Sequence, residues 1–126
     1  MKTNELEQNA RRMKPGKKAT LSDRRVCRVL GFLAAKGLLV IPGILPCHRA
    51  RLSIEDVLHV ARRVEPRVFE VFPAAYLRYP KSFLHINKIP VELRNIIRAI
   101  RLGEKECDGF AGIEYTRMKR WADRHG

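Results

Sequence analysis

Cysteine is scarce in this chain, and long apolar runs are missing. The three cysteines, Cys27, Cys47 and Cys107, are an odd set at long and unequal spacing, which indicates neither a disulfide framework nor a zinc knuckle. The longest nearly apolar stretch, residues 37–46, is too short to span a bilayer and holds two prolines. Residues 1–20 contain no apolar signal-peptide core. These absences favour a protein of the reducing cytoplasm that is neither secreted nor inserted in a membrane.

Common catalytic and cofactor-binding motifs are also missing. The chain has no G-x-x-x-x-G-K-[ST], no G-x-G-x-x-G and no H-E-x-x-H, the usual patterns for cradling phosphate or holding catalytic zinc. The best pairing of a nucleophile with a base is Cys47 beside His48. Adjacent side chains rarely meet productively, and nothing specifies an oxyanion donor. We therefore expect no catalytic residue, no cofactor and no enzymatic activity.

Metal-binding patterns are equally sparse. The four histidines do not repeat at metal-ligand spacing; they are His48, His59, His85 and His125. A small acidic cluster, Glu104, Glu106 and Asp108, falls in an expected loop, where solvated charge accounts for it better than a ligand role does. No metal site is predicted.

Acidic residues are few relative to basic ones. Asp and Glu number 13 against 26 Lys and Arg, for a formal net charge of +13. The excess is spread along the whole chain and is not confined to one tail. Because excess charge of one sign destabilises the compact state by self-repulsion, it favours an anionic partner. Nucleic acid, either DNA or RNA, is the expected partner.

The remaining composition is that of an ordinary folded protein. Of the 126 residues, 45% are hydrophobic and 31% are charged, enough for one core without disulfides or metal. Residues 1–19 are polar and basic around Pro15-Gly16 and are expected to form a mobile arm. Residues 20–126 are expected to form a single helical domain.

Capping residues and apolar spacing predict the first two helices. Residues 20–23, Thr-Leu-Ser-Asp, have the spacing of a capping box, and apolar residues then recur at helical steps until Lys36-Gly37 supplies a stop. Residues 53–56, Ser-Ile-Glu-Asp, repeat the signature and start a second helix that ends near Glu65.

Prolines mark the later helices. Pro66 suits the first position of a third helix, and Pro73 inside it predicts a kink or two abutting short helices. Residues 80–88 are expected to form a loop, after which Pro90 opens a fourth helix that ends before Gly103. A fifth helix is expected over residues 114–124.

The expected fold class is therefore mainly α, a compact bundle of about five short helices. Residues 38–41 are a short β-prone run closed by Pro42-Gly43, and pairing with residues 50–52 would add a small winged-helix-like two-stranded element. With its flanking helices, this element is compatible with part of a winged-helix or helix-turn-helix unit over residues 20–64. The pattern does not specify a recognition helix.

A row of arginines is the most regular candidate for contact with nucleic acid. Arg94, Arg98 and Arg101 stand at i, i+4 and i+7, and so form a row about 10 Å long opposite the isoleucine face. Such a row can follow phosphates. It can equally be the solvated face that any amphipathic helix needs.

Other cations complete the candidate nucleic-acid interface. The basic arm could neutralise phosphates or act as a solubilising tail. Trp121, among the C-terminal cations, could stack on an unpaired base, but its spacing from Tyr115 and Met118 favours a place in the core. The further candidates are Arg11, Arg12, Lys14, Lys17, Lys18, Arg62, Arg63, Arg117, Lys119, Arg120 and Arg124.

Three segments carry a resemblance. They are residues 65–83 (EPRVFEVFPAAYLRYPKSF), residues 89–93 (IPVEL) and the pattern Tyr115-x-x-Met118-Lys119-Arg120-Trp121. Over about half of the chain, this pattern resembles small, mostly uncharacterised bacterial proteins, some of them antitoxin-type modules. The resemblance implies a partner protein, an RNA or operator DNA, with a separate face for each. It assigns no functional residue.

Two functions are consistent with these observations. The first is a non-enzymatic, basic nucleic-acid-binding protein, bacterial and cytoplasmic, of regulatory or antitoxin type. The alternative is a protein-interaction module that neutralises or scaffolds an acidic partner protein. In that case the expected contact residues are Phe69, Phe72, Tyr76 and Tyr79.

Overall fold

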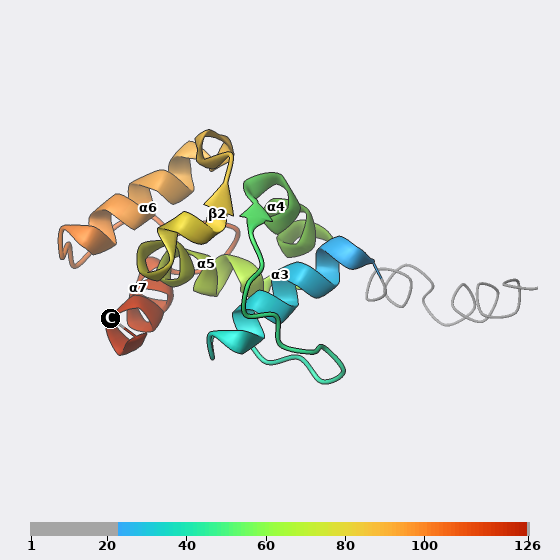
Figure 1. Cartoon of the computed structure of the whole chain (residues 1–126). Helices are drawn as coiled ribbons and strands as arrows, with labels where there is room; N and C mark the ends of the chain where they lie inside the picture. The colour runs from blue at the N-terminus through green and yellow to red at the C-terminus, as the bar shows by residue number, and fades with distance from the viewer. Residues whose placement is uncertain (1–22, 126) are drawn as a thin grey trace, which may run out of the picture.

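The computed structural model of this protein describes residues 23–125, so the expected arm, residues 1–19, lies outside the described residues. Within this range the chain forms five α-helices, two short 3₁₀ turns and a two-stranded sheet (Figure 1). The expectation of a mainly α fold with a small sheet element is confirmed. Every helix in this part of the chain is too short or too polar to cross a lipid bilayer.

Helix α3 (Arg24–Ala35) begins and ends close to the predicted signals. The Asp23 carboxylate caps it by accepting a hydrogen bond from the backbone N–H of Arg25 at 2.7 Å. Asp23 is thus the cap itself and not the fourth residue of the expected capping box, whose other residues, 20–22, lie outside the described residues. At the other end Gly37 takes a φ of 72°, and the N–H of Leu38 donates to the carbonyl of Leu33. This is the glycine-dependent stop that Lys36-Gly37 predicts.

Helix α4 (Ile54–Arg63) is capped as predicted by Ser53, whose hydroxyl accepts a hydrogen bond from the N–H of Asp56 at 3.1 Å. The helix ends two residues before the expected Glu65. The Glu65 carboxylate instead accepts hydrogen bonds from the backbone and the side chain of Arg67, at the start of the next helix.

Helix α5 (Arg67–Arg78) is the central helix, packed against α4, α6 and α7. It runs through Pro73 without interruption, so the expected division into two short helices is wrong. Residues on almost every side of α5 are buried. Its apolar residues are therefore not confined to one face of the helix. Figure 1 shows α3 and α4 on one side of α5, and α6 and α7 on the other.

Helices α6 (Val91–Arg101) and α7 (Tyr115–His125) complete the bundle. Pro90 precedes α6 and Gly103, with a φ of 75°, follows it, as predicted. The hydroxyl of Tyr115 donates to the carbonyl of Glu104 at 2.7 Å, a hydrogen bond that joins the start of α7 to the loop after α6. Burial raises the pKa of the Tyr115 hydroxyl.

The sheet pairs segments other than the expected ones. Strand β1 (Leu52–Ser53) lies parallel to β2 (Phe83–Leu84), in the register Leu52 to Phe83 and Ser53 to Leu84. The expected pairing of residues 38–41 with residues 50–52 is wrong, and no winged-helix hairpin forms within residues 23–125. Phe83 packs edge-on against Phe32 and Phe72, and this aromatic cluster places β2 beside β1.

The segment expected as a loop, residues 80–88, is therefore ordered by these contacts. It consists of a 3₁₀ turn η1 (Pro80–Ser82), strand β2 and a second 3₁₀ turn η2 (Ile86–Lys88). Turn η2 leads directly into Ile89, which is buried, and Pro90 at the start of α6. Turn η2 therefore lies between β2 and the start of α6, and only Ile89 and Pro90 separate it from that helix.

Candidate nucleic-acid interface

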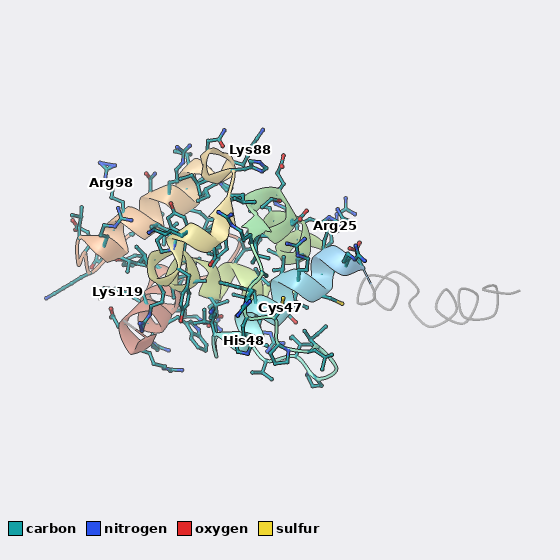
Figure 2. All side chains as sticks on the ribbon, viewed as in Figure 1. Arg25, Cys47, His48, Lys88, Arg98 and Lys119 are labelled. Carbon is teal, nitrogen blue, oxygen red and sulfur yellow. The ribbon has the colours of Figure 1, made fainter. Side chains whose placement is uncertain are left out.

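The arginine row of α6 lies as its spacing predicts. The opposite face buries Leu93, Ile96, Ile97 and Ile100, whereas Arg94, Arg98 and Arg101 are all exposed. Figure 2 shows Arg98 projecting outward from α6. Among residues 23–124, none of the three arginines forms an ion pair. The row therefore presents three guanidinium groups whose charge is not neutralised by this part of the chain.

A groove of about 440 Å³ runs beside this row. Its polar lining is Asn87 and the three arginines Arg94, Arg98 and Arg101. The rest of the lining is apolar and aromatic, and consists of Tyr76, Ile86, Ile89 and Ile97. The groove thus combines a cationic side with an apolar side, formed by α5, η2 and α6.

Tyr76 is held at the groove by two other aromatic side chains. Its ring centroid lies 6.1 Å from that of Phe72 and 5.9 Å from that of Phe83. Tyr76 is half-buried, and it lines the groove together with Ile86, of which 47% is exposed. An aromatic ring braced in this way presents a preorganised surface for contact.

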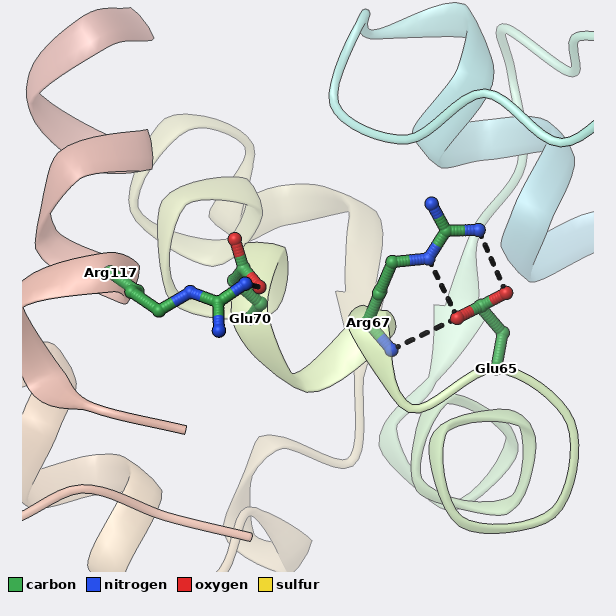
Figure 3. Close-up of polar contacts among 4 residues, drawn as sticks. All are labelled: Glu65, Arg67, Glu70 and Arg117. Carbon is green, nitrogen blue, oxygen red and sulfur yellow. Dashed lines mark hydrogen bonds and ion pairs between the residues drawn. The ribbon is translucent and has the colours of Figure 1, made fainter. Parts of the chain in front are cut away.

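The cations of α7 are mostly engaged within the fold. The guanidinium of Arg117 pairs with Glu70 of α5 at 2.9 Å (Figure 3), and Lys119 pairs with Asp123 at 2.9 Å. The hydrogen bond to Asp123 raises the pKa of Lys119. Arg117 and Lys119 therefore differ from the α6 row, because the first pairs with a carboxylate of α5 and the second with a carboxylate of its own helix.

Trp121 and Arg124 of α7 are also engaged in contacts within the fold. The indole N–H of Trp121 donates to Oε2 of Glu70 at 2.7 Å, and the half-buried ring packs against the core. The guanidinium of Arg124 lies 4.9 Å from the centroid of that ring, a cation–π distance. Arg120 is exposed and makes no ion pair within residues 23–124. Of the α7 candidates, Arg120 most resembles the α6 row.

The other basic candidates are not brought to the groove. Arg62 and Arg63 are exposed at the end of α4 and do not line it. The arm candidates lie outside the described residues; they are Arg11, Arg12, Lys14, Lys17 and Lys18.

The expected partner-binding face is wrong for two of its four aromatic residues. Phe69 is 5% exposed and packs edge-on against Phe110, and Phe72 is 2% exposed in the core. Both are buried because α5 is enclosed by helices on several sides. Tyr76 and Tyr79 are half-buried; Tyr79 packs edge-on against Phe32, and Lys36 lies 4.7 Å from its ring centroid.

The most exposed apolar side chains lie elsewhere, in the loop between α3 and β1. Val40 is 70% exposed and Leu45 is 83% exposed, and Figure 1 shows this loop extending from the body. Exposed cations follow at Arg49 and Arg51. A groove of about 270 Å³ lies at the base of the loop, lined in part by Val40 and Trp121. This apolar loop, residues 38–46, replaces the α5 aromatic residues as the candidate surface for protein contact.

The histidines, cysteines and acidic residues in the described part of the chain do not assemble into a metal site. Within the described residues, no group of three or more such side chains is placed to hold an ion. Cys47 is half-buried, and its backbone N–H donates to the carbonyl of Gly31 in α3. His48 is exposed (Figure 2). The acidic cluster Glu104, Glu106 and Asp108 is exposed in the loop after α6.

Ile86, Asn87 and Arg78 are surface residues that sequence reasoning missed. Ile86 and Asn87 line the groove from η2. Arg78 is exposed and lines a third groove, of about 350 Å³, which Arg101 also lines. The only local signal in the sequence is the spacing of Ile86 and Ile89, which stand three residues apart just before Pro90. This spacing is typical of two residues on the same side of a helical turn. Ile86 and Asn87 lie beside α6 because only Ile89 and Pro90 separate η2 from that helix.

Comparison of the sequence with protein-family models and with curated proteins, and of the structure with solved structures, finds no match. Function is therefore inferred from the residues of the groove and of the apolar loop.

Proposed function

We propose that this protein is a non-enzymatic nucleic-acid-binding protein that contacts phosphates through the arginine row of α6. The observation that carries the proposal is the exposure of Arg94, Arg98 and Arg101 without an ion pair among residues 23–124. A guanidinium group binds phosphate oxygens through two parallel hydrogen bonds. The net charge of +13 adds long-range attraction to a polyanion.

The competing explanation is an ordinary solvated helix face. Cations near the carboxyl end of a helix are favoured by its dipole, which accounts for Arg98 and Arg101 but not for Arg94. A solvated face usually intersperses charges of both signs, whereas α6 has a single acidic residue, Glu92, in its first turn. The row is therefore better explained by an external anion than by helix stability alone.

A charge-reversal experiment tests the proposal. Binding of labelled random duplex DNA, single-stranded DNA and RNA would be measured over a salt series for the wild type and for Arg94→Glu/Arg98→Glu/Arg101→Glu. The matched control reverses three exposed arginines that do not line the groove, Arg24, Arg49 and Arg51, with the same change in net charge. We expect the α6 variant to lose binding and the control to weaken it modestly.

Two results would contradict the proposal. Undetectable or salt-insensitive binding of the wild type to all three ligands would reject nucleic acid as the partner. Equal losses in the two variants would mean that net charge alone governs binding, and would return the α6 row to the solvated surface. Circular dichroism of each variant establishes that the fold is retained.

A second candidate function is a protein-interaction module for an acidic partner. It is favoured by the apolar loop, because Val40 and Leu45 are the two most exposed large hydrophobic side chains of the described residues and are followed by exposed Arg49 and Arg51. The antitoxin-type role implied by the resemblance of residues 65–83 would combine this loop with the α6 row, in a bacterial cytoplasm.

Co-purification distinguishes the second candidate from the first. A stoichiometric acidic protein that remains bound after nuclease treatment and high salt is the expected result. Val40→Ser/Leu45→Ser should release that protein and leave oligonucleotide binding intact, whereas the α6 charge reversal should do the opposite. Release of the partner by nuclease alone would rule out the loop as its binding site.

A further inference from the structure

The groove beside the arginine row has a composition that a phosphate-binding surface does not need. Tyr76 of α5 and Ile86 of η2 line it together with Arg94, Arg98 and Arg101 of α6. Phosphates are satisfied by the cations alone. Exposed apolar lining next to a row of cations instead indicates a ligand that is charged on one side and flat and apolar on the other.

An unpaired nucleotide is such a ligand, because it has a charged phosphate on one side and a flat, largely apolar base on the other. In a duplex the bases are stacked inside and the convex phosphate surface faces outward, so a duplex would touch the arginines and leave the recessed apolar side unfilled. In a single strand the bases can leave their stack and lie against aromatic and apolar side chains. The charge and the lining of the groove thus both fit a single strand.

We propose that this groove binds single-stranded nucleic acid, with phosphates on Arg94, Arg98 and Arg101 and an unpaired base against Tyr76. The inference rests on the proposed function and specifies its ligand. Tyr76 is suited to the role because Phe72 and Phe83 brace its ring from within the core. Asn87, which both donates and accepts hydrogen bonds, is placed to bond a base edge.

The choice of a single strand has a measurable signature. Fluorescence anisotropy would compare 15-nucleotide oligo(dT) and oligo(U) with a blunt duplex of the same length at several salt concentrations. We expect the single strands to bind more tightly than the duplex. Tyr76→Leu should weaken single-strand binding about 5- to 140-fold, the effect of removing one base–aromatic stack, and leave duplex binding unchanged.

Further variants keep the test decisive if Tyr76→Leu fails to fold. Ile86→Ser and Asn87→Ala change exposed side chains of η2 that line the groove without contributing to the core. They should weaken single-strand binding selectively, whereas Arg94→Gln/Arg98→Gln/Arg101→Gln should weaken binding of single strands and duplex alike. Lys105→Ala, an exposed cation that does not line the groove, is the control.

The possible failures are distinguishable. If the wild type binds none of the three ligands, the proposed function itself is wrong. If the duplex binds as tightly as the single strands, and the Tyr76, Ile86 and Asn87 variants alter neither while the arginine variant weakens both, the protein binds phosphates through α6 and the single-strand inference is wrong. Equal affinity for oligo(dT) and oligo(U) would assign the site to bases and phosphates, whereas a preference for oligo(U) would assign it to RNA.

Discussion

The indole N–H of Trp121 donates a 2.7 Å hydrogen bond to Glu70, a carboxylate that is only 15% exposed. The other oxygen of Glu70 accepts from the guanidinium of Arg117 at 2.9 Å. One side chain of α5 thus satisfies two donors of α7 along the interface between these helices. The stability of the α5–α7 pair should depend on Glu70 more than on any exposed ion pair of α7.

Glu70→Ala should lower the free energy of unfolding by about 2–3 kcal/mol, because both donors lose a charged acceptor. The matched control is Asp123→Ala, which removes an exposed i, i+4 pair with Lys119 and should change the free energy by less than about 0.5 kcal/mol. Urea denaturation followed by circular dichroism measures both. Trp121 is the only tryptophan, so its fluorescence reports the same site, and equal effects of the two variants would contradict the prediction.

Gly31→Ala should destabilise the protein although alanine is normally the better helix former. A Cβ at this buried position of α3 would lie 2.6 Å from the carbonyl oxygen of Leu45 and 3.1 Å from Cβ of Cys47. Glycine in a helix ordinarily costs about 0.5–1 kcal/mol relative to alanine, but backbone overlap should reverse the sign and cost about 1–3 kcal/mol. Thermal denaturation measures the change in Tm. A higher Tm for Gly31→Ala would show that the loop that contains Leu45 and Cys47 can move away from α3.

The N-cap of α3 should make stability depend on pH. Hydrogen bonds from the side chain and then the backbone N–H of Arg25 lower the pKa of Asp23 from 3.8 to about 2. Because the folded pKa is below the unfolded one, the carboxylate stabilises the fold fully above about pH 4, and this contribution is lost as the pH falls towards 2. Asp23→Asn retains a capping side chain. The difference in Tm between the wild type and this variant should narrow between pH 4 and pH 2; a constant difference would contradict the assignment.

The salt dependence of nucleic-acid binding should report how many arginines of the α6 row contact phosphates. Each of Arg94→Gln, Arg98→Gln and Arg101→Gln should reduce the slope of log Kd against log salt by about 0.7 on a single strand. Lys119→Gln should change the slope less, because Lys119 is already paired with Asp123. Equal slopes for the wild type and all four variants would place the phosphates elsewhere on the protein.

Much of the helical structure could be predicted from sequence because its determinants are local. Ser53 caps α4 through a hydrogen bond to the residue three positions away, as its capping box predicts, and Gly37 and Gly103 end helices by adopting positive φ. The exposed arginine row followed from i, i+4, i+7 spacing for the same reason. Each of these inferences needs only a few consecutive residues.

The features that could not be predicted depend on contacts between distant segments. Residues 38–41 have strand-like composition, yet Leu52 pairs with Phe83 because Phe83 belongs to the aromatic cluster around Phe32. Phe69 and Phe72 looked like a contact face because periodicity cannot reveal that α5 is covered on several sides. The groove that Ile86 and Asn87 line also includes Tyr76 of α5, which only the packing of α5 against α6 brings there.

The apolar loop and the groove beside the arginine row of α6 have no residue in common, and this separation has an evolutionary consequence. The groove uses residues 76–101 only, whereas the loop tip lies between Leu38 and its attachment to Gly31 at Cys47. Insertions or deletions at the tip, near Pro42-Gly43, would leave every groove residue in place. Descendants of this chain with a loop of another length would therefore keep the proposed nucleic-acid site unchanged, provided that glycine is retained at position 31.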